Sequence, residues 1–217
     1  MQILHPFSGS LQQYHEEIAD PDRRRPDRCP QCEAKTPLRA HGFYRRTLVE
    51  MYFDGLIRVR RYLCRACKRT VSLLPQFALP YLRFGISLVS QFLVARLLKG
   101  QTLGASAAAT GQPHMPYQRG QFWVRRFGHQ AEALCLALAA LICTTPAVSF
   151  VSRALQMLES LGWISSHRFL FSQLRVHLLG WPRFLAPDGR RATLGSASPP
   201  SASETHSICL ASRPLLA

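Results

Sequence analysis

The chain has 217 residues and a formal net charge of +15, with 27 Lys and Arg against 12 Asp and Glu. The hydrophobic fraction of 47% is enough for an ordinary core, and the length predicts one or two domains. A pI near 10.4 favours a polyanionic partner, most simply nucleic acid, over a neutral or acidic one. A solvated basic surface without a partner is the alternative.

The first residues, 1–6, lack a basic segment followed by a long apolar stretch, so we expect no secretory signal peptide. Cys135 and Cys143 lie in an apolar helical run and are typical of small buried hydrophobic residues. These features predict a reducing compartment and a cytoplasmic protein.

Residues 1–28 form the first predicted segment, an N-terminal extension. Its pattern predicts a short strand followed by a helix over 11–18, which Asp20-Pro21 ends. A charged turn then leads to the first cysteine pair.

Two Cys-x-x-Cys pairs are the most informative motif of the chain. Cys29 and Cys32 form the first pair, and Cys64 and Cys67 form the second, with 31 residues between the pairs. Each pair aims two thiolates at one point, and two pairs complete the tetrahedron of a structural Zn²⁺ site. Two disulfides or four unrelated thiols are the alternatives, and disulfides would require a secreted chain. Because sulfur takes all four positions, the predicted zinc is structural, one per chain.

The segment 29–75 that carries the cysteines is predicted to be a zinc ribbon. Strands are expected over 42–49, 56–63 and 70–74, and Phe53-Asp54-Gly55 predicts the hairpin turn between the first two. The hairpin gathers five arginines that we expect to contact nucleic acid: Arg45, Arg46, Arg58, Arg60 and Arg61. Their mutual repulsion is relieved when an anion lies among them, although a solvated basic face remains the alternative.

Residues 81–128 are predicted to form a helix-turn-helix region. Apolar periodicity and end signals predict helices over 86–98, 102–110 and 117–127, with Thr102 as the N-cap of the second. On the third helix five side chains suit base edges and phosphates: Gln118, Arg119, Gln121, Arg125 and Arg126. Pro113 and Pro116 lengthen the turn beyond the usual length, so a plain helical bundle stays open as the alternative.

Residues 130–180 are predicted to be a further helical region. The expected helices cover 130–143, 148–161 and 167–179. The stretch 133–152 contains no charged residue and is long enough to cross a bilayer. Since Pro146 interrupts it, we predict two buried helices that meet there, with a membrane-embedded segment as the alternative.

The C-terminal segment 181–217 is rich in Ser, Ala, Pro and Gly, and we expect it to be disordered. Carboxylates after Cys67 are too few for a two-metal phosphoryl-transfer site, and no nucleophile triad or phosphate-binding Gly motif is present. The chain is therefore predicted not to be an enzyme.

Several of these motifs resemble an uncharacterised bacterial zinc-ribbon and helix-turn-helix family, which is similar to the N-terminal DNA-binding part of insertion-sequence transposases. The resemblance covers about residues 10–128. It is carried by Arg28-Cys29-Pro30-Gln31-Cys32, His41-Gly42-Phe43-Tyr44-Arg45-Arg46, Arg60-Arg61-Tyr62-Leu63-Cys64-Arg65-Ala66-Cys67, Thr70-Val71-Ser72-Leu73-Leu74-Pro75 and Pro80-Tyr81. It implies DNA binding linked to mobile elements and does not imply catalysis.

The sequence thus predicts an α+β protein: a small N-terminal β zinc ribbon, an all-helical helix-turn-helix region and a disordered tail. The predicted function is zinc-stabilised DNA binding, in recognition of transposon ends or in regulation. One alternative is a truncated transposase subunit whose partner supplies the catalytic acids. Another is a zinc-ribbon interaction module with a membrane-associated helical part. Expected partners are DNA and either a second copy or a transposase, and we expect no membrane.

Overall fold

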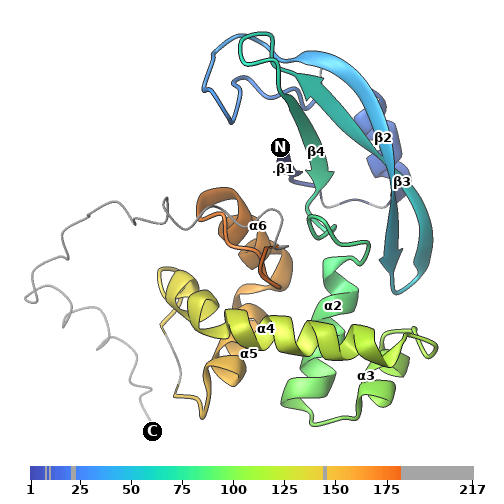
Figure 1. Ribbon diagram of the computed structural model, residues 1–217, viewed down its shortest axis with the longest axis vertical. Coiled ribbons are helices and arrows are strands. Elements are labelled where there is room, and N and C mark those ends of the chain that lie inside the picture. The colour runs from blue at the N-terminus through green and yellow to red at the C-terminus, as the bar shows by residue number, and fades with distance from the viewer. Residues whose placement is uncertain (8, 10, 21–22, 144–145, 182–217) are drawn as a thin grey trace, which may run out of the picture. The chain divides into compact units, whose positions relative to one another are not determined.

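The structure is a computed structural model that describes residues 1–7, 9, 11–20, 23–143 and 146–181 (Figure 1). This part is α+β, with one four-stranded sheet and a group of helices. The sequence predicted a disordered tail over 181–217, and residues 182–217 lie outside the described ranges.

The sheet has the strand order β1-β4-β3-β2. Its strands are β1 (Gln2–His5), β2 (Arg39–Glu50), β3 (Phe53–Leu63) and β4 (Thr70–Pro75). β1 pairs in parallel with β4, with Ile3 opposite Leu73, and the other pairings are antiparallel. The N-terminal extension therefore contributes a strand to the sheet that the cysteine-bearing segment forms.

The hairpin turn lies at Met51 and Tyr52, so the prediction that Phe53-Asp54-Gly55 makes the turn is wrong. Asp54 pairs with Val49 inside the ladder, and Gly55 pairs with Leu48. The register places Leu48, Ile57 and Val59 in one apolar cluster. Because a one-residue slip would turn these side chains to the other face, burial fixes the turn more strongly than the local Asp-Gly preference does.

Helix α1 (Leu11–Ala19) packs against the sheet. Its Tyr14 and Ile18 are buried in the cluster that contains Ile57 and Val59. The Tyr14 hydroxyl also donates a hydrogen bond to the backbone oxygen of Arg58 at 2.9 Å. One face of the β2–β3 hairpin is thereby buried, and alternation along the strands directs the next residues to the opposite face.

The remaining helices form a second cluster of elements. They are α2 (Ile86–Leu93), the π-helical turn η1 (Val94–Leu98), α3 (Leu103–Ala109), α4 (Tyr117–Leu138), α5 (Phe150–Leu161) and α6 (Trp163–Gln173). Trp123 of α4 is fully buried, with its ring 4.8 Å from Phe84 and 5.2 Å from Phe92. The predicted cap of the short α3 is confirmed, since the Ala105 amide donates to the Thr102 hydroxyl at 3.1 Å.

Helix α4 is continuous from Tyr117 to Leu138, whereas the sequence predicted one helix ending at 127 and another starting at 130. Phe127 and Ala131 are both buried in the helical core, on either side of Gly128. This burial outweighs the roughly 1 kcal/mol that a glycine costs inside a helix. The last helix was predicted over 167–179, but α6 covers Trp163–Gln173. Arg175 takes a left-handed φ of 56°, which is incompatible with a continuing helix.

The hairpin end and the helices are joined by Glu50. Its carboxylate lies against Gly85, directly before α2, and the neighbouring Val49 donates its amide to the Arg83 oxygen and accepts from the Gly85 amide. A Cβ atom at Gly85, the residue before α2, would lie 1.6 Å from the Glu50 Oε1 atom, so a larger residue there would displace the Glu50 side chain. In Figure 1 the β2–β3 hairpin accordingly points toward α2.

The uncharged stretch 133–152 is divided between the end of α4 and the start of α5. Among the helices of the described ranges, none has the length and apolar character that crossing a membrane requires.

Candidate metal centre and predicted nucleic-acid contacts

The two cysteine pairs lie in turns of the same conformation. The Cys29 amide donates to the Ala34 oxygen at 3.0 Å, and the Cys64 amide donates to the Arg69 oxygen at the same distance. In both turns the residue after the second cysteine takes a left-handed φ of 57°, at Glu33 and at Lys68. The left-handed residue closes the turn and directs both sulfurs of a pair to one side.

The four sulfurs have the spacing of a tetrahedral metal site. The Cys29 and Cys67 Sγ atoms are 3.8 Å apart, the Cys32 and Cys64 Sγ atoms are 3.7 Å apart, and all four lie within 4.8 Å of one another. A tetrahedron with Zn–S bonds of about 2.3 Å has sulfur–sulfur edges of about 3.8 Å. A disulfide needs about 2.05 Å, so these cysteines are free thiols around one common centre.

The electrostatics of the cluster favour a bound cation. The backbone amide of Cys67, and with it that of Ala66, lowers the pKa of the Cys64 thiol to about 7. At Cys32 the backbone amide of Ala34 acts in the same direction, but desolvation and the three neighbouring sulfurs prevail and raise its pKa to about 11. Four adjacent thiols therefore resist joint ionisation until a metal ion balances their charge.

The metal centre is anchored in the sheet. Cys29 and Cys64 are fully buried and form a small cluster with Leu38, Tyr62 and Val71. Cys64 directly follows β3, and the second turn leads into β4. A metal bound here would tie the turn before β2 to the connection between β3 and β4.

The five hairpin arginines divide between the two faces. Arg45 and Arg58 are exposed and lie directly opposite each other on β2 and β3, and Arg60 lies two residues from Arg58 on the same face. Arg46 and Arg61 project from the other face. Arg46 donates to the backbone oxygens of Leu79 and Leu82, and Arg61 donates to the Thr70 hydroxyl at 3.3 Å. The five guanidinium groups therefore do not form one cluster, because three lie on one face of the hairpin and two lie on the other.

The Phe43 ring contacts two of the three arginines that share one face, the exposed Arg58 and the buried Arg60. The Arg58 guanidinium carbon lies 4.1 Å from the centre of the Phe43 ring, and that of Arg60 lies 4.5 Å from it. Both distances allow cation–π attraction. Within the described ranges no carboxylate forms an ion pair with Arg45, Arg58 or Arg60. We call Phe43, Arg45, Arg58 and Arg60 the hairpin basic face.

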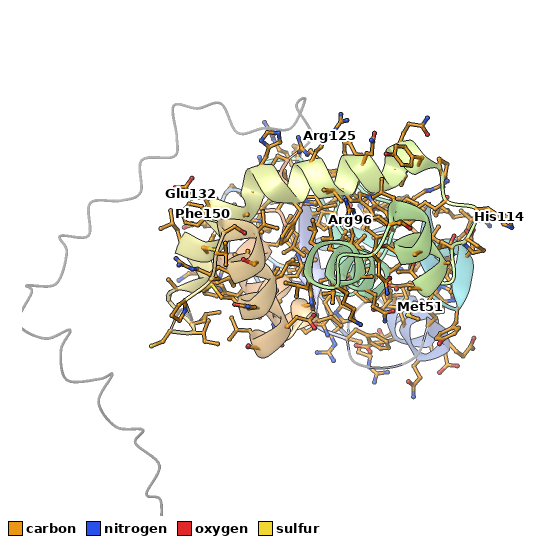
Figure 2. The ribbon with its side chains drawn as sticks, turned by 90° about the horizontal axis from the view of Figure 1, so that it is seen from below. Met51, Arg96, His114, Arg125, Glu132 and Phe150 are labelled. Carbon is orange, nitrogen blue, oxygen red and sulfur yellow. The ribbon has the colours of Figure 1, made fainter. Side chains whose placement is uncertain are left out.

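The five predicted contact residues of α4 also divide. Gln118 and Arg125 are exposed, Gln121 is partly exposed, and Figure 2 shows Arg125 pointing away from the other helices. Arg119 lies over the Phe84 ring, with its guanidinium carbon 5.4 Å from the ring centre. Arg126 donates to the Leu179 oxygen at 2.7 Å and to the Trp181 oxygen at 2.5 Å. Arg126 therefore holds the segment after α6 against α4.

Sequence reasoning missed a second group of basic and aromatic residues. Tyr81, Arg83 and Arg175 lie in loops, and the tertiary structure brings the first two to the same cavity as Tyr44 and Arg46 of β2. No periodicity marks loop residues of this kind. Pro80-Tyr81 belongs to the resemblance described above, but nothing in its pattern indicated a cavity.

Residues 29–110 are similar to a family described as "Domain of unknown function (DUF6431)". The matched stretch is shorter than half of the chain, and it contains both cysteine pairs, the hairpin and the helices up to α3. No curated protein and no solved structure matches the chain. These comparisons assign no function to residues 29–110, so the chemistry of this stretch is interpreted from its four-cysteine cluster.

Proposed function

We propose that this chain is a zinc-stabilised DNA-binding protein without catalytic activity of its own. Zn²⁺ is the ion proposed for the four-cysteine centre, because a closed tetrahedral set of four thiolates is typical of structural zinc. In this proposal the metal holds the ends of the sheet strands in place. The role in transposon-end recognition or in the regulation of a mobile element follows from the resemblance of the sequence and is part of the proposal.

The observation that carries the proposal is the hairpin basic face. Arg45 and Arg58 are opposite each other in the ladder, where like charges repel. The Phe43 ring contacts the guanidinium groups of Arg58 and Arg60. Residues 29–75 together contain ten Lys and Arg but three Asp and Glu. A DNA phosphate backbone supplies the anions that such a surface lacks.

Duplex DNA binding measured by fluorescence anisotropy tests the proposal. If about six phosphates are contacted, the affinity falls roughly a thousandfold between 50 and 200 mM salt. Arg58→Ala is expected to weaken binding and to lower the salt slope by about one, whereas Arg168→Ala, an exposed arginine of α6, serves as the charge-matched control. A salt-independent affinity, or equal losses in both variants, would reject the proposal.

A transposase subunit that needs a partner is a rival hypothesis. Incubation of the pure protein with duplex DNA and Mg²⁺ or Mn²⁺ tests for catalytic activity of the chain alone, and we expect no strand cleavage.

An interaction module is the second candidate, and one observation favours it. Near the end of α4 and the start of α5 several large apolar side chains are exposed, among them Leu136 at 72% and Phe150 at 48%. The Cys135 thiol donates to the Phe150 oxygen at 3.4 Å, so these segments are neighbours. A contiguous apolar patch is typical of protein contacts. Sedimentation analysis tests whether these apolar side chains mediate self-association. A chain that binds DNA and stays monomeric at all concentrations would contradict self-association through them.

A further inference from the structure

A cavity of about 290 Å³ opens beside the edge strand β2. It is lined by Gln2, Tyr44, Arg46, Thr47, Tyr81, Leu82 and Arg83. The lining includes two guanidinium groups, two phenols, one hydroxyl and one amide, and it includes no carboxylate. Tyr44 and Arg46 project from the opposite side of β2 to Phe43 and Arg45, and the cavity shares no lining residue with the hairpin basic face.

Arg46 is a partly buried cation, and no carboxylate of the described residues forms an ion pair with it. Its Nη2 atom donates to the backbone oxygens of Leu79 and Leu82, at 3.2 Å for Leu79. Desolvation lowers the pKa of Arg46, and no carboxylate acts against that shift. Carbonyl dipoles offset part of the cost of burying the charge. An anion in the cavity would offset the rest.

Tyr81 adds a second, independent observation. Its φ of 62° is left-handed, which a bulky side chain rarely adopts, and such strain persists where neighbouring contacts enforce it. The Tyr81 ring lies 5.8 Å from that of Trp181. Burial raises the pKa of the Tyr81 phenol, and the Arg175 guanidinium acts against that shift. The strained backbone therefore holds an aromatic ring at a cavity that Arg46 and Arg83 make basic.

We propose that this cavity binds a single nucleotide unit, with its phosphate on Arg46 and Arg83 and its base against Tyr44 and Tyr81. Guanidinium groups bind phosphate oxygens through two parallel hydrogen bonds, and aromatic side chains stack on any base. The volume lies at the lower end of small-molecule sites, which excludes a longer oligonucleotide from the cavity itself. A free nucleotide and the terminal nucleotide of a strand carry the same chemistry.

Calorimetric titration of the full chain with AMP, adenosine and inorganic phosphate tests this site. We expect AMP to bind at least tenfold more tightly than either of its parts. Arg83→Ala is expected to weaken AMP binding about tenfold, with Arg168→Ala as the matched control. Tyr81→Leu is expected to weaken AMP binding while leaving phosphate binding unchanged. No AMP binding, equal binding of adenosine and AMP, or AMP binding that neither variant alters would overturn the proposal.

Competition against AMP identifies the source of the nucleotide. Displacement by a 5′-phosphorylated single strand, but not by its 5′-hydroxyl counterpart, indicates a strand end, and displacement by neither strand indicates a free nucleotide. Displacement by both strands alike would contradict a site built around a terminal phosphate. Because Arg83→Ala leaves the hairpin basic face intact, its duplex affinity should stay that of the unmodified chain, which separates this site from the proposed DNA-binding surface.

Discussion

Replacing Cys64 by serine removes one sulfur from the candidate metal centre. The sulfur edges of 3.7 and 3.8 Å imply a metal–sulfur distance of about 2.3 Å, which a bound Zn²⁺ should reproduce with four sulfur neighbours. Structural zinc contributes roughly 10–16 kcal/mol in small metal-dependent domains, as much as the whole stability of a typical domain. If four ligands share this equally, each contributes roughly 2.5 to 4 kcal/mol, and loss of one lowers the metal affinity about a hundredfold to a thousandfold.

Three measurements on the purified protein follow from this reasoning. Metal analysis should give one zinc per chain, and X-ray absorption should give four sulfur neighbours at about 2.3 Å. Chelation, or Cys64→Ser, should remove the zinc and unfold the sheet that the turns anchor, seen as loss of strand signal in circular dichroism. Cys135→Ser is the control, because Cys135 is buried outside the cluster and a serine can keep its hydrogen bond to Phe150.

Retention of one zinc per chain in Cys64→Ser, with an unchanged metal–ligand distance, would refute the assignment. So would an unmodified protein that contains no metal and still melts cooperatively with the sheet intact. Equal metal loss in Cys135→Ser would show that the cluster responds to general destabilisation.

Two further predictions concern stability. Burial raises the pKa of Glu50 to about 7 from an ordinary 4.5, so the stability that its protonated form contributes is complete below pH 4.5 and is lost as the pH rises through 7. Glu50→Gln should therefore gain about 3 kcal/mol in unfolding free energy over the unmodified chain between pH 4 and pH 8, and urea titrations with a pH-independent difference would contradict this. Arg126→Ala should cost about 2 to 3 kcal/mol, because two backbone oxygens after α6 lose their charged donor, whereas Arg125→Ala should leave thermal stability unchanged; equal melting temperatures would contradict the assigned roles.

Local chemistry made much of this protein predictable. The Cys-x-x-Cys spacing predicted the four-cysteine cluster, because two sulfurs in one tight turn point to a common centre. Thr102 marked the start of α3 because capping involves the amide of a residue three positions away. The strands of the hairpin were predicted in type, since alternation along each strand is a property of neighbouring residues.

Long-range packing decided the rest. Gly128 lies inside a helix because the core binds the residues on either side of it, and the Asp54-Gly55 pair lies inside a strand because burial of the hairpin face sets the register. The split of the arginines, with Arg46 turned away from the hairpin basic face, depends on carbonyl groups some 33 to 36 residues further along the chain. A sequence window encodes which residues are basic, but only the folded sheet and its loops determine which of those charges meet solvent and which meet backbone oxygens, because that choice depends on contacts between distant segments.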